Sequence, residues 1–257
     1  MSAELVGLAL SPYTEKAKWA LDHHGVSYRY HEHLVMLGMP ALRLKARRLT
    51  GDVTVPLLIV NKGRDGTSRY YDSLDIARFA DAQGSSSAKL FPPGRDGEIA
   101  AINALSEEGL DAGREATLPR LFESRDARVE NLPPFIPGPL AGVSTPLVGL
   151  GLRYLMKEFN VERGAGNRGV ERLRGVLAEL RRHLASKSYL LDAFSYADIV
   201  GTLVLQFVKP LGKPYFPLGP ATQRCMTNDE LALEFSDLVR WRDQVYEKHR
   251  SGAKPSH

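Results

Sequence analysis

A segment rich in glycine, serine and proline, residues 84–94, divides the sequence into two regions with different hydrophobic patterns. Before it, short β-branched and aromatic stretches alternate with stretches of helical spacing. After it, apolar residues recur at helical spacing almost throughout. This change predicts an α/β domain over 1–83, a linker over 84–94, an all-helical domain over 95–250 and a flexible tail over 251–257. A length of 257 residues is enough for two domains.

The pattern of the first region predicts elements in the order β-α-β-α-β-β-α. Strands are predicted over 4–10, 26–31, 57–60 and 69–71, and helices over 12–24, 40–49 and 74–82. Strands that alternate with helices predict a sheet that is at least partly parallel, and the last two strands predict a hairpin.

Composition excludes several classes of protein. Hydrophobic residues make up 43% and charged residues 25%, as in soluble globular chains. The net charge of +4 is small, and acidic and basic residues are mixed, so we expect no nucleic-acid partner. A single cysteine, Cys225, forms no internal disulfide, and the N-terminus shows no signal-peptide pattern. We therefore expect a cytoplasmic protein.

The longest uncharged stretch, residues 131–152, carries five prolines. Because each proline lacks the N–H that a spanning helix needs, we expect no membrane span. The stretch is predicted to be a proline-rich loop that runs into a helix, with Thr145 as N-cap and Pro146 in the first turn.

The most informative short segment, Ser11-Pro12-Tyr13-Thr14, follows the first predicted strand and opens the first helix. The unsatisfied N–H groups and partial positive charge of a helix N-terminus favour an anion. A hydroxyl at that position can donate a hydrogen bond to a thiolate and lower the pKa of the thiol. In the alternative interpretation Ser11 is only an N-cap and Pro12 an ordinary first-turn proline.

The same segment resembles the Cys-Pro-Tyr-Cys opening of glutaredoxins, with Ser11 and Thr14 in the two cysteine positions. Neither residue forms a disulfide, so dithiol redox chemistry is excluded at this turn. What remains is similar to the glutathione transferase superfamily, in which a serine, cysteine or tyrosine near this point activates glutathione. The resemblance implies a thioredoxin-like N-terminal domain followed by an all-α helical bundle.

Two further motifs extend the resemblance within the first region. Pro56 opens the third strand; the family has a cis proline here, and the resemblance implies that the backbone of Val55 binds the cysteinyl part of glutathione. Asp72 and Ser73 resemble the family's turn before its third helix, and would bind the γ-glutamyl group. The alternatives are an ordinary strand-start proline and an ordinary helix N-cap.

In the second region, Ser195 and Asp198 form a capping box that resembles a hallmark of the family's helical domain. We expect its role to be structural. The chain departs from the family at Thr54, where many members carry a lysine that contacts the glycyl carboxylate of glutathione. Four basic residues upstream are candidates to replace that lysine or to form a solvated helix face: Arg43, Lys45, Arg47 and Arg48.

Two other patterns do not predict a binding site. Residues 164–169 match Gly-x-Gly-x-x-Gly, but they lie between helices, so we predict a flexible loop and no dinucleotide site. His31 and His33 share one face of a predicted strand without a third ligand, and we expect no metal.

The resemblance implies a transferase that conjugates glutathione, its co-substrate, to a hydrophobic electrophile. Ser11 would be the catalytic residue, with Tyr13 and Thr14 as the candidates if Ser11 does not have this role. Apolar residues of the helical half would line the electrophile pocket, with residues 131–152 as a candidate wall. Two alternatives stay open: a non-catalytic ligand- or partner-binding protein on the same fold, and another glutathione-dependent activity such as isomerisation, dehalogenation or reduction.

The resemblance also implies a homodimer, because members of the superfamily usually pair about a two-fold axis. The candidate interface residues are Tyr70, Tyr71, Arg78 and Phe79. For Phe79 alone, we expect the side chain to face the core of its own domain and Arg78 to point outward.

Overall fold

The computed structural model describes residues 2–84, 86, 88–133, 136–137 and 141–250. Parts of three segments singled out from the sequence therefore lie outside the described residues: linker residues 85 and 87, residues 134–135 and 138–140 of the proline-rich segment, and the whole predicted tail 251–257.

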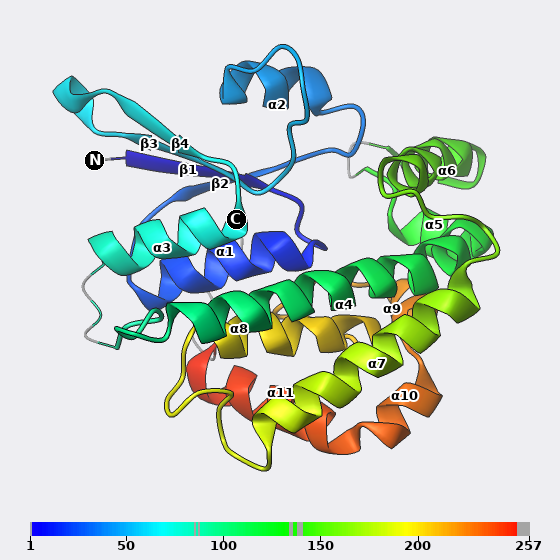
Figure 1. Cartoon of the computed structure of the whole chain (residues 1–257). Helices are drawn as coiled ribbons and strands as arrows, with labels where there is room; N and C mark the ends of the chain where they lie inside the picture. Colours follow the sequence, from blue (N-terminus) through cyan, green and yellow to red (C-terminus); the bar gives the residue numbers. More distant parts are fainter. Residues whose placement is uncertain (1, 85, 87, 134–135, 138–140, 251–257) are drawn as a thin grey trace.

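The N-terminal region is built on a small mixed sheet (Figure 1). Its strands are β1 (Ser2–Gly7), β2 (Arg29–Glu32), β3 (Leu57–Asn61) and β4 (Thr67–Tyr70). In the described residues the strand order is β2-β1-β3-β4, with β1 and β2 parallel and the other two pairs antiparallel. The predicted order of elements, the partly parallel sheet and the final hairpin are confirmed.

Helices cover both faces of the sheet. Helices α1 (Pro12–His23) and α3 (Ser73–Gln83) lie on the face toward the helical region, and α2 (Met39–Ala46) lies on the opposite side (Figure 1). Gly25, with a φ of 65°, ends the first helical segment as its position predicts. Leu42 of α2 packs with Val6 in a separate small core, so the sheet is buried on both faces.

The rest of the chain is mostly helical, as predicted. The helices are α4 (Asp96–Glu123), α5 (Arg125–Glu130), α6 (Ala141–Glu158), α7 (Gly166–Leu184), α8 (Tyr196–Val204), α9 (Pro220–Met226), α10 (Asp229–Glu234) and α11 (Ser236–His249). Two 3-10 turns, Gly63–Asp65 and Leu205–Phe207, complete the regular elements of the described chain. Every residue of α8 is buried, because this helix runs through the centre of the helical layer.

Two predicted helix starts are wrong. Pro146 lies inside α6, which begins at Ala141, so Thr145 is not its N-cap. Residues 164–169 are not a loop throughout, because α7 begins at Gly166. The glycine at 169 reflects packing rather than a loop, because a Cβ on Gly169 would lie 2.6 Å from the backbone N of Ala116 in α4. Gly169 therefore allows α7 and α4 to pack closely.

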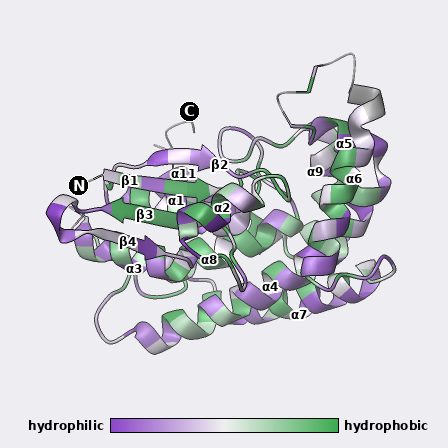
Figure 2. Ribbon diagram, turned by 90° about the horizontal axis from the view of Figure 1, so that it is seen from above, coloured by the Kyte–Doolittle hydropathy of each residue, from purple (hydrophilic) through white to green (hydrophobic). Residues whose placement is uncertain are grey.

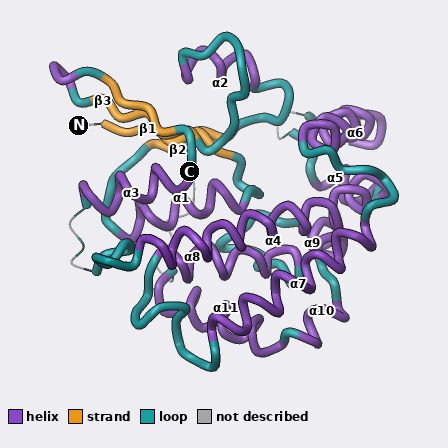
Figure 3. Tube along the Cα trace, viewed as in Figure 1, coloured by secondary structure: helices purple, strands orange, loops and turns teal. Residues whose placement is uncertain are grey.

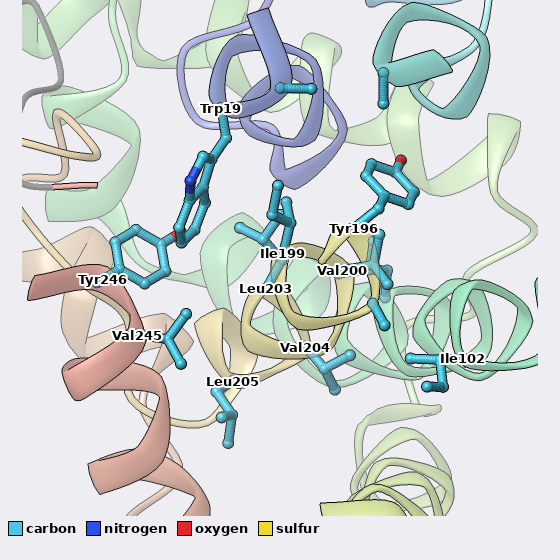
Figure 4. Close-up of a cluster of buried hydrophobic side chains, with 14 of the residues drawn as sticks. Trp19, Ile102, Tyr196, Ile199, Val200, Leu203, Val204, Leu205, Val245 and Tyr246 are labelled. Atoms are coloured by element: carbon cyan, nitrogen blue, oxygen red, sulfur yellow. The ribbon is translucent and has the colours of Figure 1, made fainter. Parts of the chain in front are cut away.

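A single core joins the two regions. Trp19 of α1 is fully buried, and its ring lies 4.5 Å from that of Tyr246 in α11. Figure 4 shows these two rings beside Ile199 and Leu203 of α8, which pack under α1. Apolar and polar residues alternate at short intervals along the helices (Figure 2), and the buried apolar ones form the core. Among the residues described, no helix is both long enough and apolar enough to cross a membrane.

The backbone trace in Figure 3 separates the sheet from the helices and shows that the sheet lies at one side of the molecule. The fold is the predicted one, a thioredoxin-like mixed sheet followed by a mostly helical region. For the site, the important consequence is that α1 lies between the sheet and the helices, so groups from both regions meet at it.

Candidate functional site

Sheet register brings the candidate residues to one edge of the sheet. Val6, near the end of β1, pairs with Leu57 at the start of β3, and Leu58 pairs with Tyr70 at the end of β4. The chain therefore leaves β1 toward Ser11, enters β3 from Val55 and leaves β4 toward Asp72 at the same edge. Three stretches that are far apart in the sequence meet there.

Ser11 is the N-cap of α1 and is half-buried. Its N–H donates to the carbonyl of Leu8 at 2.9 Å, and its own carbonyl accepts from Glu15 at 3.1 Å. In the described part of the chain, the Ser11 hydroxyl bonds to no protein group. The main chain of Ser11 is thus fixed while its hydroxyl stays available to a ligand.

Thr14 has the opposite environment. Its side chain is buried, and its Oγ1 accepts a hydrogen bond from the N–H of Leu8 at 3.0 Å. The bond holds the turn between β1 and α1, and a Cβ at Gly7 would clash with Thr14 at 2.4 Å. The hydroxyl of Thr14 therefore faces the protein backbone.

Tyr13 is directed toward α4. The Nζ of Lys16 lies 4.8 Å and the Cζ of Arg114 5.4 Å from the centre of its ring. Burial raises the pKa of the Tyr13 phenol, so the phenol stays protonated at neutral pH and can only donate or accept a hydrogen bond. The Tyr13 hydroxyl also interacts with the side chains of Glu107 and Arg114. Of the three candidate hydroxyls, that of Ser11 is the one that bonds to no protein group in the described residues.

The Val55–Pro56 peptide bond is cis, as the family resemblance implies. Pro56 is buried, whereas Val55 is half-buried and precedes the first ladder bonds of β3. Within the residues described, no protein group bonds to the N–H or the C=O of Val55. Both main-chain groups are therefore free for an extended peptide ligand.

Asp72 and Ser73 begin α3. Asp72 is the N-cap, and its Oδ1 accepts from the N–H of Leu74 at 2.7 Å. Ser73 is buried beside the hydroxyl of Tyr196 in α8. The N-cap interpretation is confirmed. The second oxygen of Asp72 and the remaining first-turn N–H groups of α3 could bind the charged groups of an amino acid.

Comparison with known proteins identifies the fold on which this geometry occurs. Residues 10–83 match the family model described as glutathione S-transferase, N-terminal domain. The chain has the glutathione transferase fold. A search of the curated proteins finds no match.

Solved structures agree over the whole length of the chain. A glutathione S-transferase of Ceriporiopsis subvermispora in complex with glutathione gives a TM-score of 0.63 at 17% identity, with 100% of each chain covered. One from Methylobacterium radiotolerans in complex with glutathione sulfonate gives 0.58 at 18%, covering 100% of this chain and 92% of that one. A glutathione S-transferase domain-containing protein of Marinobacter aquaeolei gives 0.60 at 19%, with 98% of both chains covered.

On this glutathione transferase fold, most of the basic residues proposed to replace the missing lysine have protein partners. Arg43 donates to the carbonyl of Gly51 at 2.9 Å, and Lys45 pairs with Glu4 at 3.0 Å. The guanidinium of Arg48 lies 3.8 Å from the centre of the Tyr71 ring. These contacts favour the alternative in which the basic residues form a helix face without a ligand, although Arg48 lies beyond the end of α2.

Sequence reasoning missed the charged contacts between α1 and α4. Lys16, which is fully buried, forms an ion pair of 2.7 Å with Glu107 of α4. Burial lowers the pKa of Lys16, and the Glu107 carboxylate opposes that shift. The spacing of Glu107 and Arg114, seven residues apart, places both on one helix face. That spacing was visible in the sequence, but only the packing shows which helix they face.

Two cavities lie away from these candidates. One of about 430 Å³ is bounded by the chain after Leu205–Phe207 and by α11, and one of about 220 Å³ lies between α4 and the α6–α7 connection. Neither is lined by Ser11, Val55, Asp72 or Ser73. In the described ranges, no group of histidine, cysteine and acidic side chains has metal-site geometry.

Of the candidate interface residues, Phe79 packs in the core of its own region, as predicted. Arg78 points outward and forms an ion pair of 3.1 Å with Asp96 at the start of α4. Part of the outward surface of α3 is therefore already in contact with the chain's own helical region.

Proposed function

We propose that this protein is a cytoplasmic glutathione transferase that conjugates glutathione to an apolar electrophile. Residues 1–83 would form the glutathione-binding domain and residues 95–250 the helical domain, joined by the 84–94 linker. The observation that carries the proposal is a set of groups at one sheet edge that have no partner among the described residues: the Ser11 hydroxyl and the Val55 main chain, next to the N-terminus of α3. Solved structures of the same fold that hold glutathione or glutathione sulfonate add support.

In the proposed reaction, glutathione lies extended along this edge. Its cysteinyl main chain pairs with the N–H and C=O of Val55 beside Pro56, and its γ-glutamyl group binds Asp72 and Ser73. The Ser11 hydroxyl donates to the sulfur, and the N-terminus of α1 favours the thiolate over the thiol. The sulfur then attacks the electrophile, and the leaving group departs with its electron pair.

Replacement of one serine tests this assignment. Ser11→Ala should lower kcat/KM for conjugation by about 100-fold, the typical cost of removing one donor that stabilises a developing or resting anion. Ser124→Ala is the matched control, because Ser124 is also a helix N-cap but lies at α5, far along the chain. Full activity in Ser11→Ala would remove Ser11 from the mechanism and make Tyr13, then Thr14, the residues to replace.

A non-catalytic binding protein on the same fold is the second candidate. Thr54 stands where the family resemblance implies a lysine for the glycyl carboxylate of glutathione, and Arg43, Lys45 and Arg48 are engaged with protein groups. Titration calorimetry with glutathione separates the two candidates. Saturable heat at micromolar to millimolar ligand is expected of the transferase, and its absence favours the binding protein.

We also propose that the protein is a homodimer, since closed two-fold pairs are the commonest homo-oligomers. Light scattering at micromolar concentration should give about twice the mass of one chain. A mass equal to one chain would show that the dimer does not form.

A further inference from the structure

Arg114 lies at the end of α1 that carries Ser11. Lys16 contacts Glu107, and Tyr13, one turn earlier in α1, contacts Arg114, two turns later in α4. The two helices therefore run antiparallel along this contact, and Figure 1 shows α4 passing the start of α1 on its way to α5 and α6. Arg114 is the basic residue that α4 presents next to the Ser11 turn.

The guanidinium of Arg114 lies near two aromatic rings. Its Cζ is 4.1 Å from the centre of the Phe159 ring, which follows α6, and 5.4 Å from the centre of the Tyr13 ring. The side chain is only 15% exposed. The guanidinium of Arg114 therefore lies in an aromatic environment, and the Nζ of Lys16 lies 4.8 Å from the centre of the same Tyr13 ring.

Arg114 has hydrogen-bond donors left for a ligand. A guanidinium has five N–H donors. Within the described residues one of them bonds to Asp111, an exposed residue one turn earlier, and the guanidinium also interacts with the Tyr13 hydroxyl. In the same described residues the buried Nε atom has no partner. Because Nε is shielded, an incoming oxyanion would contact the terminal nitrogens, and a planar oxyanion matches the paired donors of a guanidinium best.

Neighbouring carboxylates leave Arg114 able to bind an anion. The negative charge of Glu107 is balanced by buried Lys16, and Asp111 is a partly solvated partner on the rim. Asp111 and Phe159 also line the cavity of about 220 Å³, which lies toward Arg168 and Arg172 of α7 and is not lined by Tyr13 or Ser11.

We propose that Arg114 binds the anionic group of the electrophile, so that the preferred substrates are aromatic electrophiles carrying a carboxylate. The inference rests on the proposed function, because it assigns the second substrate of the same site. The aromatic ring of the substrate would lie against Phe159 and Tyr13, and its reacting carbon would face the Ser11 turn.

For an aryl chloride the step balances simply. The glutathione thiol loses its proton to solvent, the thiolate sulfur forms a bond to the ring carbon, and the carbon–chlorine bond breaks with the electron pair leaving on chloride. Arg114 takes no part in the bond changes; it is a binding residue for the distant carboxylate.

The probes are a matched pair. One is a chloronitrobenzoate with chlorine para to the carboxylate and ortho to the nitro group, and the other is the benzamide of the same pattern. Each rate is divided by the uncatalysed rate with glutathione, which removes the difference in intrinsic reactivity. Affinity is measured separately by calorimetry with the two unreactive analogues that lack chlorine, nitrobenzoate and nitrobenzamide, in the presence of glutathione.

Two arginine variants make the comparison. Arg114→Gln should lower the benzoate-to-benzamide ratio of corrected kcat/KM, and the corresponding affinity ratio, by about 10- to 100-fold, as expected for loss of a charge-assisted bidentate contact. Arg182→Gln, which makes the same change of charge at an exposed site on α7, should alter neither ratio. Circular dichroism of both variants checks that they are folded.

The outcomes separate the two proposals. If the wild type binds nitrobenzoate no more tightly than nitrobenzamide, or if Arg114→Gln retains the preference, the anion assignment is wrong while conjugation of the benzamide still supports the transferase. If neither chloro compound is conjugated but nitrobenzoate binding depends on Arg114, the transferase proposal fails and the anion site stands.

Discussion

Two helix N-termini in this molecule begin with the same residue type and have opposite environments. At α8, Ser195 is fully buried, and Asp198 accepts hydrogen bonds from the N–H groups of Leu190 at 2.8 Å and Ser195 at 2.9 Å. At α1, Ser11 is half-buried and its hydroxyl bonds to no described protein group. The first N-terminus is satisfied by the protein itself, and the second leaves its polar groups for something else.

The difference separates structural from functional capping residues. A buried N-terminus without internal partners would cost too much to form, so α8 carries its own carboxylate. An N-terminus at the surface can remain unsatisfied because water replaces the ligand when the site is empty. Replacing residues at the two sites should therefore affect stability at one and ligand binding at the other.

The largest effect is expected at Asp198. Asp198→Ala leaves two buried N–H groups without acceptors, those of Leu190 and Ser195, and should lower the free energy of unfolding by about 3 kcal/mol. Urea denaturation measures the change. Asp75→Ala, which removes an exposed carboxylate from the first turn of α3, is the control and should cost less than about 1 kcal/mol. Equal losses would show that the α8 capping box has no special role.

A pH dependence follows from the same carboxylate. Burial raises the pKa of Asp198 from 3.8 to about 6, although its hydrogen bonds oppose the shift. Because the folded value is the higher one, the stabilisation is complete below pH 3.8 and is lost as the pH rises through about 6. The stability of the wild type relative to Asp198→Asn should therefore fall between pH 4 and 7, by on the order of 1–3 kcal/mol.

Urea denaturation of both proteins across that pH range decides the sign. A relative stability that rises with pH would mean that the hydrogen bonds from Leu190 and Ser195 outweigh burial and hold the carboxylate ionised.

A smaller loss of stability is expected at Asp72, because its environment is intermediate between the buried N-terminus of α8 and the open N-terminus of α1. It caps α3 with one hydrogen bond, yet it is exposed. Asp72→Ala should cost about 1 kcal/mol of stability, and it should also weaken glutathione binding about 10-fold in calorimetry. Asn228→Ala is matched, because Asn228 caps α10 through one bond of 3.0 Å. It should lose similar stability without a change in glutathione affinity.

The smallest change in stability is expected at Ser11. Because its hydroxyl has no partner in the part of the chain that the structure describes, Ser11→Ala should alter the free energy of unfolding by less than about 0.5 kcal/mol, whatever its effect on conjugation. Thermal denaturation beside Ser124→Ala, which loses a cap bond to Ala127, provides the comparison. A cost of about 1 kcal/mol or more at Ser11 would mean that the hydroxyl caps the helix in solution, and the contrast with α8 would disappear.

Much of this architecture was predictable because it depends on local patterns. The alternation of strands and helices before residue 84 and the capping box at Ser195 and Asp198 are visible as periodicity and spacing. The helix starts at Gly166 and Ala141 were not predicted correctly. Within α7, Gly169 packs closely against the distant helix α4, a contact that no local pattern records.

The sequence by itself determined the order of elements, the Ser11 turn, the Val55–Pro56 pair and the Asp72–Ser73 cap, because each depends on residues close together in the chain. Only the tertiary structure decided that the hydroxyl of Thr14 is bonded to the backbone while that of Ser11 bonds to no group among the described residues. It also decided that Arg114 lies beside Tyr13, since a helix pattern gives the face of a residue but not the neighbour that the face meets.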